Sequence, residues 1–185
     1  TNHDVCKENT LILLDLGARV KGYNADITRT YPVSGKFTER QKQFYNIVLE
    51  ANQTVAAQAR PGVTLKELND ICKSVLAKGL IELGLIEKEE EVGRYYMHGV
   101  SHHLGIDVHD VTVPEKAKLE PGMIITDEPG LYIDEEEIGI RVEDDLLITE
   151  DGCVVLSKDI VRTVEDIKTK TKENIYKVVI AATEL

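Results

Sequence analysis

Two segments of the chain repeat apolar residues every three or four positions, the spacing of one face of an α-helix. The first follows Thr38 and Gln41, which match the capping box of a helix N-terminus. It continues to Pro61-Gly62, a pair that ends helices. We expect a helix between these signals. Its predicted core-facing residues are Phe44, Ile47, Val48, Ala51, Val55 and Ala59.

The second helical segment carries the same kind of boundary signals. Thr64 and Glu67 form another capping box, and Gly84 is a typical helix end. The apolar stripe between them predicts a helix that packs into the core rather than a cofactor site. Its residues are Leu65, Leu68, Ile71, Cys72, Val75, Leu76 and Leu83.

Strand-like segments lie on both sides of the helices. Residues 11–17 are apolar and β-compatible, Lys21-Gly22 is a turn signal, and residues 23–33 form another β-like run, so we expect a hairpin. From Met123 onward the pattern is again that of strands. Asp151-Gly152 predicts a second hairpin turn.

That second hairpin would join residues 144–149 to residues 153–156, and a short amphipathic helix would follow it. The chain shows no internal repeat, low-complexity tract or linker. We therefore expect a single α+β unit.

Composition excludes several classes of partner. With 185 residues and 42% apolar content, the chain can build one sizeable core or one lobe of something larger. Its net charge of −11 disfavours nucleic acid. No apolar run approaches the roughly 20 residues that span a bilayer, and no signal peptide is visible. Three scattered cysteines favour a reducing compartment. We expect a cytoplasmic protein without membrane contact.

Histidines suggest where the chemistry lies. Four of the five, His98, His102, His103 and His109, fall within twelve residues. Such a cluster is typical of metal binding or proton transfer, although a solvated loop would also accommodate it. On an extended chain His102 and His103 point to opposite sides, so both cannot face one site.

Carboxylates embedded in apolar strands supply the second half of the pattern. Asp15 interrupts an apolar run, Asp26 follows eleven residues later across the hairpin, Glu128 precedes Pro129, and Glu143 ends the string GIRVE. Asp15 could instead cap a turn. Acidic residues 134–137 look like a solvated surface.

Arg141 and Glu143 are two positions apart, so they share a face of a strand. A simple surface ion pair is the alternative for these two. Four carboxylates cannot converge without compensating charge, and two divalent cations would balance them. Oxygen ligands with one or two imidazoles suit manganese, cobalt or zinc, and paired ions hold a hydroxide for hydrolysis.

The residues also resemble a known family. The strings LLDLGARVKGYNADITRT, HGVSHHLGIDVHD, EPGLYI and GIRVEDD, in this order, are similar to the Xaa-Pro peptidases aminopeptidase P and prolidase. The resemblance implies the pita-bread (creatinase/aminopeptidase) fold, a curved antiparallel sheet flanked by helices. It also implies a dinuclear site, most simply with two Mn²⁺, or with Co²⁺ or Zn²⁺. The implied metal ligands are Asp15, Asp26, His102, Glu128 and Glu143, with Asp26 and Glu143 bridging both ions.

The same resemblance assigns the remaining site residues. His98 would bind substrate, His109 would stabilise the developing oxyanion, Arg141 would support the site, and Glu128 would also shuttle a proton. His103 would be a bystander. The implied reaction is hydrolysis of the bond between an N-terminal residue and proline.

Part of the family pattern is absent. Relatives carry a substrate-handling histidine shortly before the asparagine that Asn2 matches. The apolar run that starts at Leu11 also suggests a beginning in mid-fold. We therefore expect residues 1–185 to be a partial pita-bread catalytic domain, a C-terminal fragment incomplete at its N-terminal side. Its expected partners are a proline-containing peptide and the missing N-terminal part, within a homo-oligomeric parent. Alone it should be inactive.

Rival interpretations remain within the same fold. Methionine aminopeptidases share the five-ligand pattern, but DITRT, SHHLGIDVHD and EPGLYI favour the proline-directed branch. A metal-free pita-bread binding module and a creatinase-like hydrolase are disfavoured because all five ligands are present. Aminopeptidase P and prolidase are left undecided.

Overall fold

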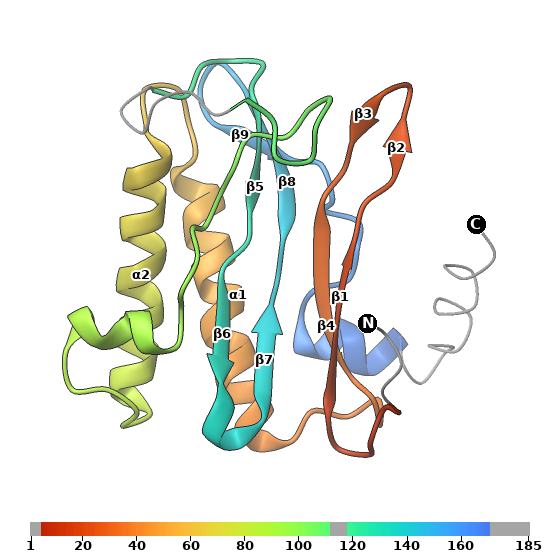
Figure 1. Cartoon of the computed structure of the whole chain (residues 1–185), viewed down its shortest axis with the longest axis vertical. Coiled ribbons are helices and arrows are strands. Elements are labelled where there is room, and N and C mark those ends of the chain that lie inside the picture. Colours follow the sequence, from red (N-terminus) through yellow and green to blue (C-terminus); the bar gives the residue numbers. More distant parts are fainter. Residues whose placement is uncertain (1–4, 112–117, 171–185) are drawn as a thin grey trace.

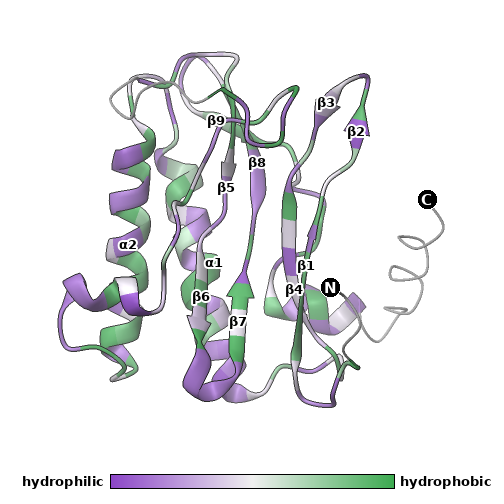
Figure 2. Cartoon of the chain, viewed as in Figure 1, coloured by the Kyte–Doolittle hydropathy of each residue, from purple (hydrophilic) through white to green (hydrophobic). Residues whose placement is uncertain are grey.

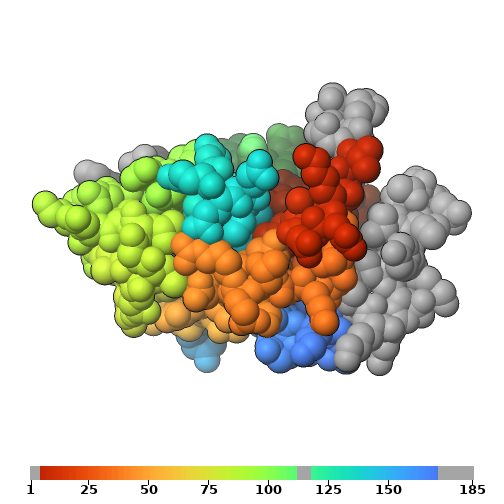
Figure 3. All heavy atoms as spheres, turned by 90° about the horizontal axis from the view of Figure 1, so that it is seen from below, coloured from red at the N-terminus to blue at the C-terminus, as the bar shows by residue number. Residues whose placement is uncertain are grey.

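The computed structural model describes residues 5–111 and 118–170. Its strands form a layer with two long helices against one face (Figure 1). Seen from below, the hairpin of β6 (Gly130–Ile133) and β7 (Ile138–Arg141) rests on α1 (Glu39–Gln58), and β1 (Leu11–Leu16) lies beside it (Figure 3). The strands therefore have one face covered by helices.

The two predicted helices are confirmed. α1 (Glu39–Gln58) begins after Thr38 and α2 (Leu65–Glu82) begins after Thr64, and both capping boxes are formed. Each box satisfies two backbone N–H groups that a helix start leaves without partners. After α2, Gly84 adopts a φ of 73°, which glycine tolerates and which ends the helix.

The first predicted hairpin forms with an interruption. β1 (Leu11–Leu16) pairs antiparallel with β4 (Ile27–Pro32), and the short strands β2 (Arg19–Val20) and β3 (Tyr23–Asn24) pair above them. Lys21 and Gly22 both have positive φ, as a two-residue type I′ turn requires.

The interruption lies between the two pairs of strands. The backbone of Ala25 passes so close to Gly17 that a Cβ there would stand 1.8 Å from the Ala25 carbonyl oxygen. Only glycine fits, and this break in the ladder places Asp26 immediately before β4.

The second half of the chain supplies the remaining strands. β5 (Ile124–Asp127) pairs with β8 (Asp144–Ile148), and β8 also pairs with β9 (Cys153–Val155). β6 (Gly130–Ile133) pairs with β7 (Ile138–Arg141). All these pairs are antiparallel, as predicted. The last hairpin joins β8 to β9 through a four-residue loop, residues 149–152. Residues 164–170 are helical, and the rest of the predicted closing helix lies outside the described residues.

Short 3-10 segments and the core complete the architecture. η1 (Glu89–Arg94) follows α2, and η2 (Asp134–Glu136) joins β6 to β7. Hydrophobic and hydrophilic residues alternate along α1 and α2 (Figure 2), and the apolar ones pack against the strands. The largest fully buried side chains include Phe44, Tyr45, Leu68, Leu76, Tyr96, Ile125, Ile140 and Leu146. No helix in residues 5–111 or 118–170 is long and apolar enough to cross a membrane.

Candidate metal centre

Five sequence-predicted residues reach one region from separate strands and loops. Asp15 lies on β1, and Asp26 directly precedes β4. His102 lies in the segment that leads to a bridge between His103 and Ile125 of β5. Glu128 directly follows β5, and Glu143 lies between β7 and β8. The strand pairings bring these distant positions together.

Asp26, His102 and Glu143 form the centre of this group. One ligand atom from each lies within 4.8 Å of the other two. The Nε2 atom of His102 is 3.5 Å from Oδ2 of Asp26 and 3.5 Å from Oε1 of Glu128. Two ligands of one zinc-like ion, each about 2.1 Å from it, lie roughly 3.0–3.4 Å apart. The donor types and their spacing therefore fit a divalent cation.

Asp15 lies at the outer side of the group. Its side chain is 51% exposed and lies near the Asp26 carboxylate, whose pKa it raises. Its Oδ2 atom also accepts a hydrogen bond from Arg141 at 2.6 Å. Asp15 is therefore next to Asp26, as the hairpin spacing predicted, and an arginine from β7 offsets part of its charge.

The carboxylates of this group repel one another. Burial, together with the charges of Glu128 and Asp26, raises the pKa of Glu143 to about 8, although Thr28 and Arg141 oppose the change. Burial and the neighbouring Asp15 carboxylate raise the pKa of Asp26 as well. The protein's own cations thus leave negative charge uncompensated, and a bound cation would remove that deficit.

Arg141 connects the carboxylates to the histidine segment. Its Nε donates to the hydroxyl of Thr28 at 3.0 Å, and that hydroxyl donates to Oε2 of Glu143 at 2.6 Å. One guanidinium nitrogen donates to the hydroxyl of Tyr132 at 3.3 Å. The Tyr132 hydroxyl is 2.8 Å from Nε2 of His98. Arg141 therefore contacts both Thr28 and Tyr132, between the carboxylates and His98.

The tautomer of His98 follows from its two contacts. Nδ1 lies 2.8 Å from the carbonyl oxygen of Gly99, which can only accept, so Nδ1 carries the proton. Nε2, the other ring nitrogen, faces the Tyr132 hydroxyl. Thr28 and Tyr132 were not identified from the sequence as site residues, although they lie inside the strings DITRT and EPGLYI.

The other two histidines behave differently. The exposed ring of His109 packs edge-on against the ring of His102, with centroids 4.4 Å apart. His103 is buried, and burial lowers its pKa. His109 therefore lies beside the predicted ligand His102, whereas the side chain of His103 is buried.

Comparison with known proteins identifies the family to which this arrangement belongs. Residues 1–150 match Metallopeptidase family M24. The chain belongs to this family. It is 41% identical over 180 residues to the Xaa-Pro aminopeptidase of Escherichia coli K12, and this alignment covers 88% of the chain and 41% of that protein. It is 36% identical to human Xaa-Pro aminopeptidase 3, and that alignment covers 90% of the chain and 36% of the human protein.

Solved structures agree with this M24 assignment. A Bacillus anthracis protein described as an aminopeptidase P superposes with a TM-score of 0.90 at 52% identity, covering 94% of the chain and 42% of that protein. A variant of Escherichia coli aminopeptidase P gives 0.81 at 42% identity, covering 86% and 40%. The chain thus spans about two fifths of these relatives. The predicted family and pita-bread fold are confirmed.

A second polar group lies behind the M24 site and was missed in the sequence. Asp144 is fully buried and accepts hydrogen bonds from Arg29, Arg162 and Ser157. Arg29 also donates to the backbone carbonyl of Glu143. Burial raises the pKa of Asp144, but these partners more than reverse the effect and hold it below the ordinary value. The sequence gives no periodic signal for such a group.

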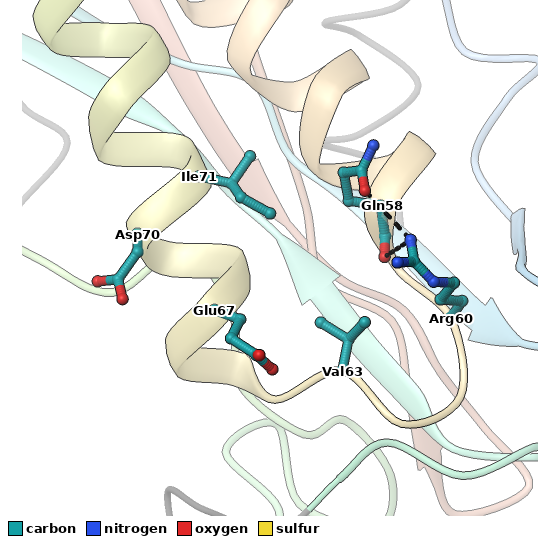
Figure 4. Close-up of a pocket in the computed structure, with 6 residues that line it drawn as sticks. All are labelled: Gln58, Arg60, Val63, Glu67, Asp70 and Ile71. Atoms are coloured by element: carbon teal, nitrogen blue, oxygen red, sulfur yellow. Dashed lines mark hydrogen bonds between the residues drawn. The ribbon is translucent and has the colours of Figure 1, made fainter.

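A surface depression elsewhere in the M24 chain takes no part in this site. It has a volume of about 280 Å³ between the end of α1 and the start of α2 (Figure 4). Arg60 on its rim hydrogen-bonds to Gln58, and Glu67 is occupied in the capping box of α2. None of the predicted site residues lines it. The lining residues are Gln58, Arg60, Val63, Glu67, Asp70 and Ile71.

Proposed function

We propose that the protein containing this chain is a metal-dependent peptidase that cleaves the bond between an N-terminal residue and proline. The observation that carries the proposal is the convergence of Asp26, His102 and Glu143, with Glu128 3.5 Å from His102. Family membership supports it, because the matching family is one of metallopeptidases.

The proposed ligands are the five residues predicted from the sequence: Asp15, Asp26, His102, Glu128 and Glu143. Asp26 and Glu143 are at the centre of the group, which suits carboxylates that bridge two ions. Oxygen-rich ligands with one imidazole favour Mn²⁺, with Co²⁺ or Zn²⁺ as alternatives. When bound, such ions supply a nucleophilic hydroxide near neutral pH and polarise the scissile carbonyl.

The remaining residues would bind, orient and move protons. Glu128 lies at the edge of the group with a partly exposed carboxylate, a suitable position for a proton shuttle. His109, beside His102, would donate to the developing oxyanion. His98 would hold the substrate with the ring orientation that Tyr132 and Gly99 fix. Arg141 would keep Asp15 and Thr28 in place.

Proline-directed specificity rests on the relatives. Proteins named Xaa-Pro aminopeptidase match at 35–41% identity. This match favours Xaa-Pro cleavage by the present protein over methionine aminopeptidase activity or a metal-free binding role. Their names also favour aminopeptidase P over prolidase. We further propose a cytoplasmic protein whose active form is homo-oligomeric and needs sequence beyond this partial domain, residues 1–185. The isolated 185-residue chain should therefore be inactive.

A substrate series with the complete protein tests the proposal. In Mn²⁺, an aminopeptidase P cleaves an Xaa-Pro tripeptide, whereas a prolidase cleaves only the dipeptide. Metal analysis should find about two equivalents per chain. Glu128→Ala and His109→Ala should each cripple turnover, by about 100-fold or more, with unchanged circular dichroism. Near wild-type rates in either variant would refute the assigned role, and metal-free protein would refute the peptidase.

A further inference from the structure

The segment around His98 is held by one side-chain atom from a helix outside the site. Residues 96–100 form no helix or strand, and they run between α2 and the strands (Figure 1). Oδ1 of Asn69, on α2, accepts a hydrogen bond from the backbone N–H of Val100 at 3.1 Å. The same oxygen accepts from the hydroxyl of Tyr96 at 3.3 Å. These two donors lie on either side of His98.

Both anchor points are buried, whereas the residues between them are not. Tyr96 and Val100 are each 1% exposed, and His98 is half-buried. The Tyr96 ring packs edge-on against the imidazole, with centroids 4.8 Å apart. Asn69 therefore fixes the backbone at Val100 and the side chain at Tyr96, and the Tyr96 ring packs against the His98 ring between them.

Other backbone hydrogen bonds of this segment come from the strand side rather than from α2. The backbone carbonyl of Tyr95 accepts from the N–H of Tyr132, and the carbonyl of Val100 accepts from the N–H of Glu128. Both bonds tie the segment to the strand side. α2 also contacts η1, whose Val92 belongs to the same hydrophobic core as the buried face of α2, but apolar packing is not directional. Asn69 adds hydrogen bonds from the helix side to both ends of the segment, beside the interaction of the Tyr96 hydroxyl with Cys72 on the same helix.

We propose that Asn69 is a positioning residue that acts through His98. Asn69 lies on α2, outside the carboxylate group. Its hydrogen bonds keep Nε2 of His98 on the Tyr132 hydroxyl and the ring aimed at the site. The inference rests on the proposed function insofar as turnover is the readout, but the geometry of the loop does not depend on the reaction.

Enzyme kinetics on the complete protein provide the first test. Asn69→Leu removes the acceptor and should lower kcat/KM for an Xaa-Pro tripeptide about tenfold, chiefly through KM. Asn69→Asp retains an acceptor oxygen and should stay within about threefold of wild type. Val75→Ala, on the same helix, removes apolar contact alone. It should lower Tm without lowering kcat/KM.

A double-mutant cycle separates positioning from general damage. If Asn69 acts through His98, the variant Asn69→Leu/His98→Ala should be no slower than His98→Ala. Losses that multiply in the double variant would overturn the proposal, as would wild-type kinetics in Asn69→Leu.

A spectroscopic readout covers the case in which the wild type cleaves no Xaa-Pro peptide, which would refute the proposed function by itself. The imidazole ¹⁵N resonances of His98 should then shift in Asn69→Leu and return to their wild-type positions in Asn69→Asp. Unchanged resonances in Asn69→Leu would refute the positioning role independently of any activity.

Discussion

Glu143 and Asp144 are neighbours in the chain and acidic alike, yet they lie in opposite electrostatic surroundings. Glu143 faces Asp26 and Glu128, and its pKa rises to about 8 through burial and their charge. Asp144, on the other side, accepts hydrogen bonds from Arg29 and Arg162, and its pKa falls below the ordinary value because these partners outweigh burial. Both side chains are almost fully buried.

The difference shows how the fold separates structural from functional charge. Asp144 has its positive partners within the chain, so its ionised form is stabilised by folding. Glu143 has one hydroxyl and a more distant arginine, with Nε of Arg141 3.9 Å from its Oε2, and several carboxylates nearby. An added cation would compensate this charge. Adjacent residues on an extended chain alternate faces, which is why the two groups can differ so much.

The largest expected effect is the loss of activity when the Glu143 carboxylate, which has no full positive partner nearby, is removed. Glu143→Gln should reduce kcat/KM for an Xaa-Pro peptide by more than about 100-fold, because even the outer partners of metal ligands cost 10–100-fold when removed. Metal content should fall in parallel, as measured by elemental analysis. Asp134→Asn, an exposed change on η2, is the matched control. Full metal content in Glu143→Gln would remove this residue from the proposed ligands.

Removing the balanced charge should instead affect stability. Asp144→Ala leaves Arg29 and Arg162 without their buried partner, so the free energy of unfolding should fall by about 3–5 kcal/mol. Urea denaturation of the metal-free protein measures this. A loss below about 1 kcal/mol would mean that the arginines find other partners and that the contrast with Glu143 is overstated.

The pH dependence of stability should have opposite signs at the two sites. The folded pKa of Glu143 lies above its unfolded value, so its contribution is fully present below about pH 4.5 and is lost as pH rises through about 8. Over that pH range the free energy of unfolding of metal-free Glu143→Gln should therefore rise relative to that of the wild type, by an amount on the order of a few kcal/mol. For Asp144, whose pKa is lowered, stability is lost as pH falls instead.

Urea denaturation in a chelator at pH 5 and pH 8.5 resolves that gain. The two proteins should be nearly equal at the lower pH and differ at the higher one. Saturating Mn²⁺ should reverse their order, because only wild type retains the full ligand set. A pH-independent difference would show that Glu143 is ionised in the metal-free fold.

The smallest expected effect concerns the link from the carboxylates to His98. Tyr132→Phe keeps the ring but removes the hydroxyl that joins Arg141 to His98. One such hydrogen bond is worth about 1 kcal/mol, so kcat/KM should fall roughly five- to tenfold. Metal content should not change. A drop as large as that of Glu143→Gln would place Tyr132 in the chemistry rather than beside it.

Much of the fold could be predicted because its signals are local. The capping boxes at Thr38 and Thr64, the turn at Lys21-Gly22 and the hairpin before Cys153 all depend on residues within a few positions of one another. The break at Gly17 was not predicted, because it depends on the approach of Ala25 from across the hairpin.

The site divides in the same way. The embedded carboxylates and the histidine cluster could be identified from the sequence, because a charged residue in an apolar run is unusual wherever it occurs. Thr28, Tyr132 and Asn69 could not, since hydroxyl and amide residues are common and only their distances give them a role.

The sequence by itself therefore determined the elements, the family strings and the pool of candidate ligands, which all follow from residue type and short-range spacing. Tertiary structure alone decided which partner each charge receives. Nothing in the adjacent letters of Glu143 and Asp144 indicates that one meets arginines and the other meets carboxylates. That outcome depends on which strands pair and on which face of the sheet each side chain lies, and both are set by contacts more than a hundred residues apart in the chain.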